Sequence, residues 1–185
     1  MKGVVFNLLE AFVVEGWGEE TYERLISKCP LKTKEPFVGP GTYPDSDLLV
    51  IANAAARTLG ISLDDALVAF GAYCFPKLAA TLPAGLEGYD SAKGFLLDVD
   101  RVIHVEVRKL LPEAKTPKFT YEDPSPDQLY IRYESERKLC RFMEGLLDGV
   151  AAYFQIKIDH EQTCCVHQGA PHCLFALRFQ GGDAG

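Results

Sequence analysis

The chain has 185 residues, of which 48% are apolar and 11% aromatic, and its formal net charge is −7. This composition suits one folded domain, or two closely packed parts, with a large core. The negative charge gives the chain no electrostatic reason to bind nucleic acid or an anionic membrane. Asn7 and Glu10 interrupt the N-terminal apolar run, and no apolar stretch is long enough to span a membrane. We therefore expect a cytoplasmic protein without a signal peptide.

The first half of the sequence has the apolar spacing of helices. Residues 1–15 form one such segment before Gly16, and residues 19–28 form a second before Pro30. Capping residues and helix breakers then predict a helix from Asp45 or Ser46 to Gly60, and another from Ser62 with a kink at Pro76. A further helix is predicted from Ser91 through Leu96. It continues from Val99 to Leu111 and stops before Pro112.

The second half mixes alternating and helical patterns. Alternation predicts strands at residues 128–133, 156–160, 163–167 and 173–179, and Ser135 is expected to cap a helix that continues to Val150. We predict an α+β fold in which a helical N-terminal part, residues 1–60, precedes helices packed on a small antiparallel sheet, residues 61–180. Residues 181–185 lack large apolar side chains and are expected to form a flexible tail.

One histidine and one short motif carry the chemistry that we consider most informative. His104 lies in the predicted helix that starts at Val99, where a neutral ring nitrogen can bind a metal. Tyr133, Ser135 and Arg137 offer two hydroxyls and a guanidinium, which can hold a pair of carboxylates. A haem needs both, a nitrogen ligand for iron and partners for its propionates. The alternative is a half-buried histidine, an ordinary strand tyrosine, a capping serine and a solvated arginine.

Three segments resemble the H-NOX family of haem nitric oxide/oxygen binding domains, which are related to the haem domain of soluble guanylate cyclase. They are residues 1–7, residues 104–110, and the Tyr-x-Ser-x-Arg motif followed by Gly145-Leu146-Leu147. The resemblance covers about residues 1–180. It implies a single domain with haem b between its helical and sheet-bearing parts.

The resemblance also implies roles for individual residues. His104 would be the axial iron ligand; Tyr133, Ser135 and Arg137 would bind the propionates; and Pro117 would pack against the haem and distort it. The remaining residues expected to pack on the haem or line its gas-binding side are Val5, Leu9, Cys74, Leu78, Phe142 and Leu146.

The gas-binding side of the expected site lacks a strong hydrogen-bond donor. Bound O₂ carries partial negative charge, which a donor stabilises, whereas NO binds ferrous haem without such help. In O₂-binding members of the family a tyrosine stands where this chain has Phe142, although Phe142 also suits the core face of a helix. We therefore expect NO and CO to bind and O₂ not to bind stably.

By the same resemblance, we expect a gas sensor without catalytic activity. NO would weaken the bond between iron and His104, and the resulting conformational change would regulate a separate partner, either a histidine kinase or a diguanylate cyclase. A haem enzyme would need a distal acid–base residue, which Leu9, Cys74 and Phe142 do not supply.

The cysteines offer an alternative function, a thiol or zinc redox sensor. Cys140, Cys165 and Cys173 match the cysteine positions of a Cys₃His zinc site found in some H-NOX proteins, but Gln162 stands at the histidine position. His160, two residues away, and Cys164 are then the candidate fourth ligands. Otherwise the thiols are packed as small apolar groups.

Overall fold

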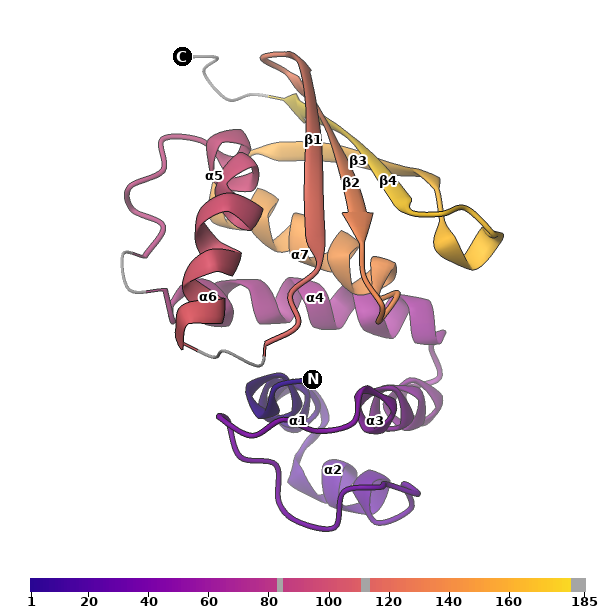
Figure 1. The fold of residues 1–185 in the computed structure, drawn as a ribbon. Helices are drawn as coiled ribbons and strands as arrows, with labels where there is room; N and C mark the ends of the chain where they lie inside the picture. The colour runs from indigo at the N-terminus through magenta and orange to yellow at the C-terminus, as the bar shows by residue number, and fades with distance from the viewer. Residues whose placement is uncertain (83–84, 111–113, 181–185) are drawn as a thin grey trace.

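Helices precede a C-terminal sheet in the computed structural model, which describes residues 1–82, 85–110 and 114–180 (Figure 1). The α-helices are α1 (Gly3–Trp17), α2 (Glu19–Ile26), α3 (Asp45–Leu59), α4 (Leu63–Ala79), α5 (Ala92–Asp98), α6 (His104–Leu110) and α7 (Cys140–Tyr153). A π-helical turn, η1 (Val99–Ile103), joins α5 to α6, and a 3-10 turn, η2 (Val166–Gln168), precedes the last strand. The helix expected to end at Leu111 and the expected tail at residues 181–185 reach beyond the described residues.

A four-stranded antiparallel sheet closes the chain. It contains β1 (Lys118–Ser125), β2 (Gln128–Glu134), β3 (Lys157–Cys164) and β4 (Cys173–Gln180), in the order β1-β2-β4-β3. The predicted α+β architecture is therefore confirmed. Figure 1 shows the layers: α1 and α3 lie against α4 with α2 on their far side, α7 lies between α4 and the sheet, and α5 and α6 stand at one side.

Two of the predicted strands were wrong in detail. Residues 156–160 and 163–167 were expected to form separate strands, but β3 is continuous to Cys164 and is followed by η2. Strand β1 was not predicted at all. It lies at the edge of the sheet, where exposed charged residues and a proline are tolerated. Because of this composition, its sequence lacks the regular alternation of apolar and polar residues that predicts a strand.

The predicted capping of the helices is right in three places and wrong in two. The residue that caps the N-terminus of α3 is Pro44, and not Asp45 or Ser46 as expected. Ser62 accepts a hydrogen bond from the Asp65 amide at 3.0 Å, Ser91 accepts one from Gly94 at 3.1 Å, and Gly60 ends α3 with a left-handed φ of 71°. Ser135, in contrast, does not begin α7, which starts five residues later at Cys140. Lys138 has a φ of 53°, which no helix residue adopts, so residues 135–139 form a turn.

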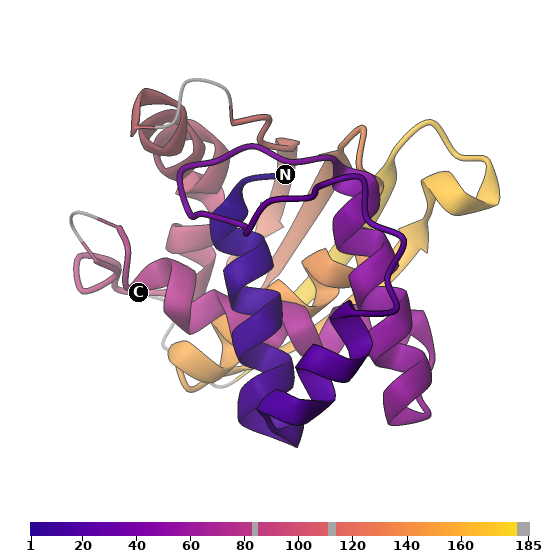
Figure 2. The ribbon, with the colours of Figure 1, turned by 90° about the horizontal axis from the view of Figure 1, so that it is seen from below.

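Two apolar cores share α4. The first is built from α1, α2, α3 and the Leu67, Phe70 and Cys74 side of α4; Figure 2 shows these helices from below. The second lies between α4, α5, α7 and the sheet and includes Phe75 and Ala79 of α4. The boundary expected after residue 60 thus falls between two helices, but the helix after it belongs to both cores.

Glycines bring α4 and α7 together. A Cβ added to Gly145 would lie 1.9 Å from the Val68 carbonyl oxygen, and one added to Gly71 would lie 2.3 Å from the Phe142 carbonyl oxygen. Only residues without a side chain allow this approach, so the crossing fixes how far α7 lies from α4.

Within the part of the chain that the structure describes, no single helix has the length and apolar composition needed to cross a membrane, and α3 and α4 meet that test only as a pair bent by 107°.

Candidate functional site

A cavity of about 340 Å³ opens where α1, α4, α7, the η1–α6 segment and the sheet meet. This volume lies at the lower end of the range of about 300–1,000 Å³ usual for sites of small molecules and cofactors. The residues predicted from the sequence that line it are His104, Tyr133, Ser135, Arg137, Val5, Leu78, Pro117, Phe142 and Leu146. Leu9 and Cys74 do not line this cavity; both are buried in the first core.

His104 begins α6 directly after the π-helical turn, and its side chain is 14% exposed. Its Nδ1 lies 3.2 Å from Oδ1 of Asp100, and its ring packs on Phe119 with the ring centroids 5.3 Å apart. Burial lowers the pKa of His104, while Asp100 opposes that change. A neutral imidazole whose Nδ1 faces a carboxylate can use Nε2 as a metal ligand, and the carboxylate fixes the ring orientation.

The Tyr133–Ser135–Arg137 motif lies at the end of β2 and in the turn before α7. Tyr133 is buried, and burial raises the pKa of its hydroxyl, so the hydroxyl stays protonated and able to donate. The Ser135 hydroxyl accepts a hydrogen bond from the Arg137 amide at 3.2 Å. These three side chains at one side of the cavity supply the hydroxyls and the cation that carboxylates bind.

Arg137 also connects the two parts of the molecule. Its Nε donates to Oδ1 of Asp45 at 3.0 Å, and its Nη1 donates to the carbonyl of Lys115. The same Asp45 carboxylate pairs with the amino group of Met1, which also lines the cavity. Burial would raise the pKa of Asp45, but the Met1 amino group and Arg137 together hold it below its ordinary value. This network could not be predicted from the sequence, because Asp45 and Arg137 are 92 positions apart.

The wall that α1, α4 and α7 contribute to the cavity is entirely apolar. Its side chains come from Val4, Val5, Phe75, Leu78, Ala79, Phe142, Met143, Leu146, Leu147 and Val150. None of them carries a hydroxyl, amide or ring N–H that could donate a hydrogen bond. The imidazole of His104 and the other polar side chains of the lining, among them Thr81 and Tyr121, thus lie outside this apolar wall.

The arrangement fits a haem. The apolar lining suits the face of a macrocycle, His104 can hold the iron, and the cationic motif can hold two propionates. Asp100, four positions before His104 in the chain, is the carboxylate that orients the ring, and it was not among the site residues predicted from the sequence.

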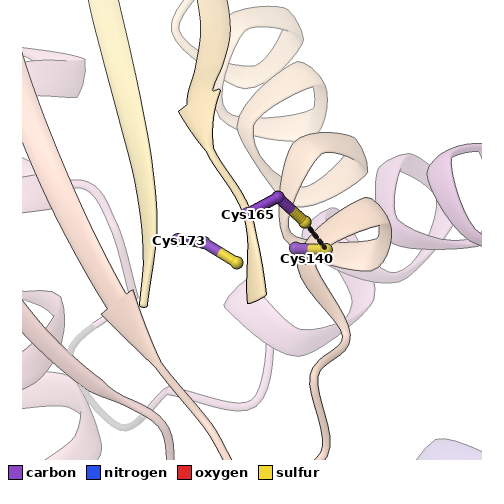
Figure 3. A group of neighbouring side chains, drawn as sticks. All are labelled: Cys140, Cys165 and Cys173. Atoms are coloured by element: carbon purple, nitrogen blue, oxygen red, sulfur yellow. Dashed lines mark hydrogen bonds between the residues drawn. The ribbon is translucent and has the colours of Figure 1, made fainter. Parts of the chain in front are cut away.

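Three of the cysteines that do not line the cavity gather in one place (Figure 3). The sulfur atoms of Cys140, Cys165 and Cys173 all lie within 4.8 Å of one another, and Cys140 Sγ is 3.7 Å from Cys165 Sγ. Burial raises the pKa of Cys140, and the Gln162 amide opposes that rise. We call these residues the three-thiol cluster.

Neither expected fourth ligand joins the three-thiol cluster. His160 Nε2 lies 2.8 Å from Oδ1 of Asp148, and Cys164 Sγ donates to the His172 carbonyl at 3.5 Å. Among the described residues, no further His, Cys, Asp or Glu offers a ligand atom within 4.8 Å of all three sulfurs. The zinc site expected from the sequence thus has three of its four ligands in place.

A helical part and a sheet-bearing part that enclose an apolar cavity, with an imidazole and a carboxylate-binding motif in its lining, define a haem-binding sensor domain. The family model described as Haem-NO-binding matches residues 2–162, and the chain belongs to that family.

Solved structures agree in fold over almost the whole chain. An H-NOX protein of Shewanella oneidensis in the Fe(II)NO ligation state is 34% identical, has a TM-score of 0.91, and is matched over 98% of this chain and 100% of that one. An unliganded Fe(II) H-NOX protein of K. algicida is 25% identical with a TM-score of 0.86, over 98% of this chain and 97% of that one.

Soluble guanylate cyclase 89Db of Drosophila melanogaster is 26% identical in an alignment 163 positions long that covers 83% of this chain and 23% of that protein. The chain therefore spans about a quarter of the length of this curated relative.

Proposed function

We propose that this domain senses nitric oxide through a haem b held by His104, and that it has no catalytic activity of its own. The observation that carries the proposal is the contrast between a carboxylate-oriented imidazole and a wall of α1, α4 and α7 side chains without a hydrogen-bond donor. When bound, haem supplies a ferrous iron that takes up diatomic gases. A wall without donors gives no help to bound O₂, whereas NO and CO do not need it.

The position of His104 explains how binding can become a signal. His104 begins α6 after a π-helical turn, a feature often found at functional sites. Its ring contacts Phe119 of β1. A change in the bond between iron and His104 would therefore displace both α6 and the sheet. Arg137 and Asp45 link the same site to α3. A shift of His104 can therefore move the two parts of the molecule relative to each other.

We propose that a separate signalling protein, a histidine kinase or a diguanylate cyclase, reads this movement. The match to part of a guanylate cyclase supports a role in signalling. We also propose a cytoplasmic location, because all six cysteines are free, as is usual in a reducing compartment.

The first experiment is an absorption spectrum of the purified protein after reduction with dithionite, recorded without gas, in air and with NO. We expect a high-spin ferrous spectrum that NO shifts and air initially leaves unchanged. His104→Gly, supplied with free imidazole, should regain a haem spectrum, whereas Leu9→Ala, outside the cavity, should bind haem without imidazole. A stable oxygen complex would contradict the NO selectivity, and a protein that takes up no haem would contradict the role of His104.

The alternative function, a redox sensor that uses cysteine or zinc, is supported by the three-thiol cluster. Replacing Cys140 and Cys173 together should leave the response to NO intact if the haem proposal is right. Loss of signalling in that variant, with an unchanged NO spectrum, would favour the alternative.

A further inference from the structure

The three-thiol cluster is a built site and not a chance encounter of cysteines. Cys140 and Cys173 are 1% and 0% exposed, and Cys165 is 7% exposed. They come from three elements: the first residue of α7, the residue after β3, and the first residue of β4. Figure 3 shows the Cys165 sulfur directed at the Cys140 sulfur and the Cys173 sulfur facing that pair, and all three sulfurs lie within 4.8 Å of one another. Three convergent thiols in one buried place can bind a single thiophilic ion.

The number of ligands argues against a structural zinc ion. Zinc in such sites is bound by four ligands in a tetrahedron. His160 and Cys164 are engaged with Asp148 and His172, as described above. Gln162 stands near Cys140 instead, and its buried Nε2 has no hydrogen-bond partner. Glutamine is not among the usual zinc ligands, so the fourth side of the site faces an amide.

The net charge of the occupied site also argues against a divalent ion such as zinc. The polar groups that the structure places against the three sulfurs within the described residues are weak: the Val166 amide, which donates to Cys173 Sγ at 3.5 Å, the Gln162 amide and the first turn of α7. Three thiolates around a monovalent ion would leave two negative charges in a buried place, and a divalent ion would leave one. Uncompensated buried charge is costly, so an ion with three positive charges suits the cluster best.

We propose that Cys140, Cys165 and Cys173 form a three-coordinate site for a trivalent thiophilic ion of the arsenite class. Arsenous acid, As(OH)₃, reacts with three thiols without any change in oxidation state. Three As–O bonds break, three As–S bonds form, and each thiol proton leaves with a hydroxide as water. The product is neutral, and the lone pair of arsenic takes the place of a fourth ligand on the side of Gln162.

The test uses the full, haem-loaded protein with all thiols reduced by a phosphine. After incubation with sodium arsenite and desalting, we expect one arsenic per chain by native mass spectrometry, and only sulfur neighbours by X-ray absorption. Thiol titration of the denatured, loaded protein should find three of the six cysteines consumed. Consumption of only two thiols, or oxygen neighbours around arsenic, would overturn the three-coordinate site.

Variants make the test specific to this site. Cys165→Ser should lose arsenic, whereas the matched variant Cys164→Ser, one position away, should retain it. Equal retention by both variants would overturn the proposal. The titration of the unaltered protein remains decisive if Cys165→Ser does not fold.

Gln162→His tests the missing fourth ligand. It should raise the affinity for Zn²⁺ by about tenfold or more, which corresponds to about 1.4 kcal/mol. If the unaltered protein instead binds one Zn²⁺ that resists chelators and excludes arsenite, the cluster is a zinc site and the proposal is wrong. None of these outcomes depends on NO binding, so the proposed sensor function is tested separately.

Discussion

Phe142 occupies the apolar wall of the cavity, where its ring lies 5.3 Å from that of Phe70. Each side chain that α1, α4 and α7 place in this wall is apolar, so a single hydroxyl would be the first donor there. A tyrosine ring has nearly the volume of phenylalanine and adds only that hydroxyl.

Phe142→Tyr is therefore expected to give the domain a measurable affinity for O₂. One hydrogen bond of about 1–1.5 kcal/mol to the bound gas would raise that affinity by up to about tenfold. The measurement is an oxygen titration followed by absorption of the ferrous protein. Phe142→Leu, which keeps the wall apolar, is the control and should show no gain. Equal O₂ binding by both variants would mean that the missing donor does not decide selectivity.

Site residues that lie close together in the sequence could be predicted. Contacts between residues that lie far apart in the sequence could not. Tyr133, Ser135 and Arg137 were singled out from their local spacing and His104 from its place in a predicted helix together with the family resemblance, and all four line one cavity. The pairing of Arg137 with Asp45 and the amino group of Met1 could not be foreseen, because neither partner lies near the motif in sequence. Leu9 and Cys74 were assigned to the cavity by resemblance, but both are buried in the first core and do not line the cavity.

The close crossing of α4 and α7 sets the depth of the cavity, since both helices contribute to its wall. Gly145 faces the backbone of Val68, and Gly149 faces the side chain of Phe75. A methyl group at Gly145 cannot be accommodated by rotating a side chain, because the atom it meets is a backbone carbonyl oxygen.

Gly145→Ala should lower the free energy of unfolding by about 1–3 kcal/mol, the usual cost of overpacking, despite the better helix propensity of alanine. Denaturant titration followed by circular dichroism measures it. Gly16→Ala is the matched control: Gly16 is exposed in α1 and a Cβ there meets nothing within 4 Å. That variant should be neutral or more stable by up to about 1 kcal/mol. An equally stable Gly145→Ala protein would show that the helices separate without cost.

At the level of elements, helices were predicted more reliably than strands. Apolar spacing and capping residues act within a few positions, which is why the starts of α4 and α5 were found. The start of α7 was misplaced because the left-handed Lys138 is not a glycine and gave no warning. Strand β1 depends on pairing with β2, and its own sequence, which is largely exposed, does not reveal that partner.

The segment between α2 and α3 leads into α3, whose first residue, Asp45, pairs with Arg137 and with the amino group of Met1. The way this segment is held to α3 therefore bears on the stability of the whole molecule. Asp47 of α3 is 1% exposed and accepts hydrogen bonds from the amides of Lys32 and Thr33 at 3.0 and 2.9 Å. The Thr33 hydroxyl donates to it as well, at 2.7 Å. Burial alone would raise the pKa of Asp47, but these hydrogen bonds hold it below the ordinary value of 3.8.

A carboxyl whose pKa is lowered by folding stabilises the protein most at pH values above its ordinary pKa, and that contribution is lost as the pH falls through the lowered, folded pKa. We expect Asp47→Asn to reduce the free energy of unfolding by about 1–3 kcal/mol at neutral pH, with the deficit shrinking in acid. Denaturant titrations from pH 7 to the acid limit of folding, on both proteins, give this difference directly. Asp90→Asn, at an exposed carboxyl, should follow the unaltered protein throughout. A deficit that stays constant with pH would mean that Asp47 acts through shape alone and not through its charge.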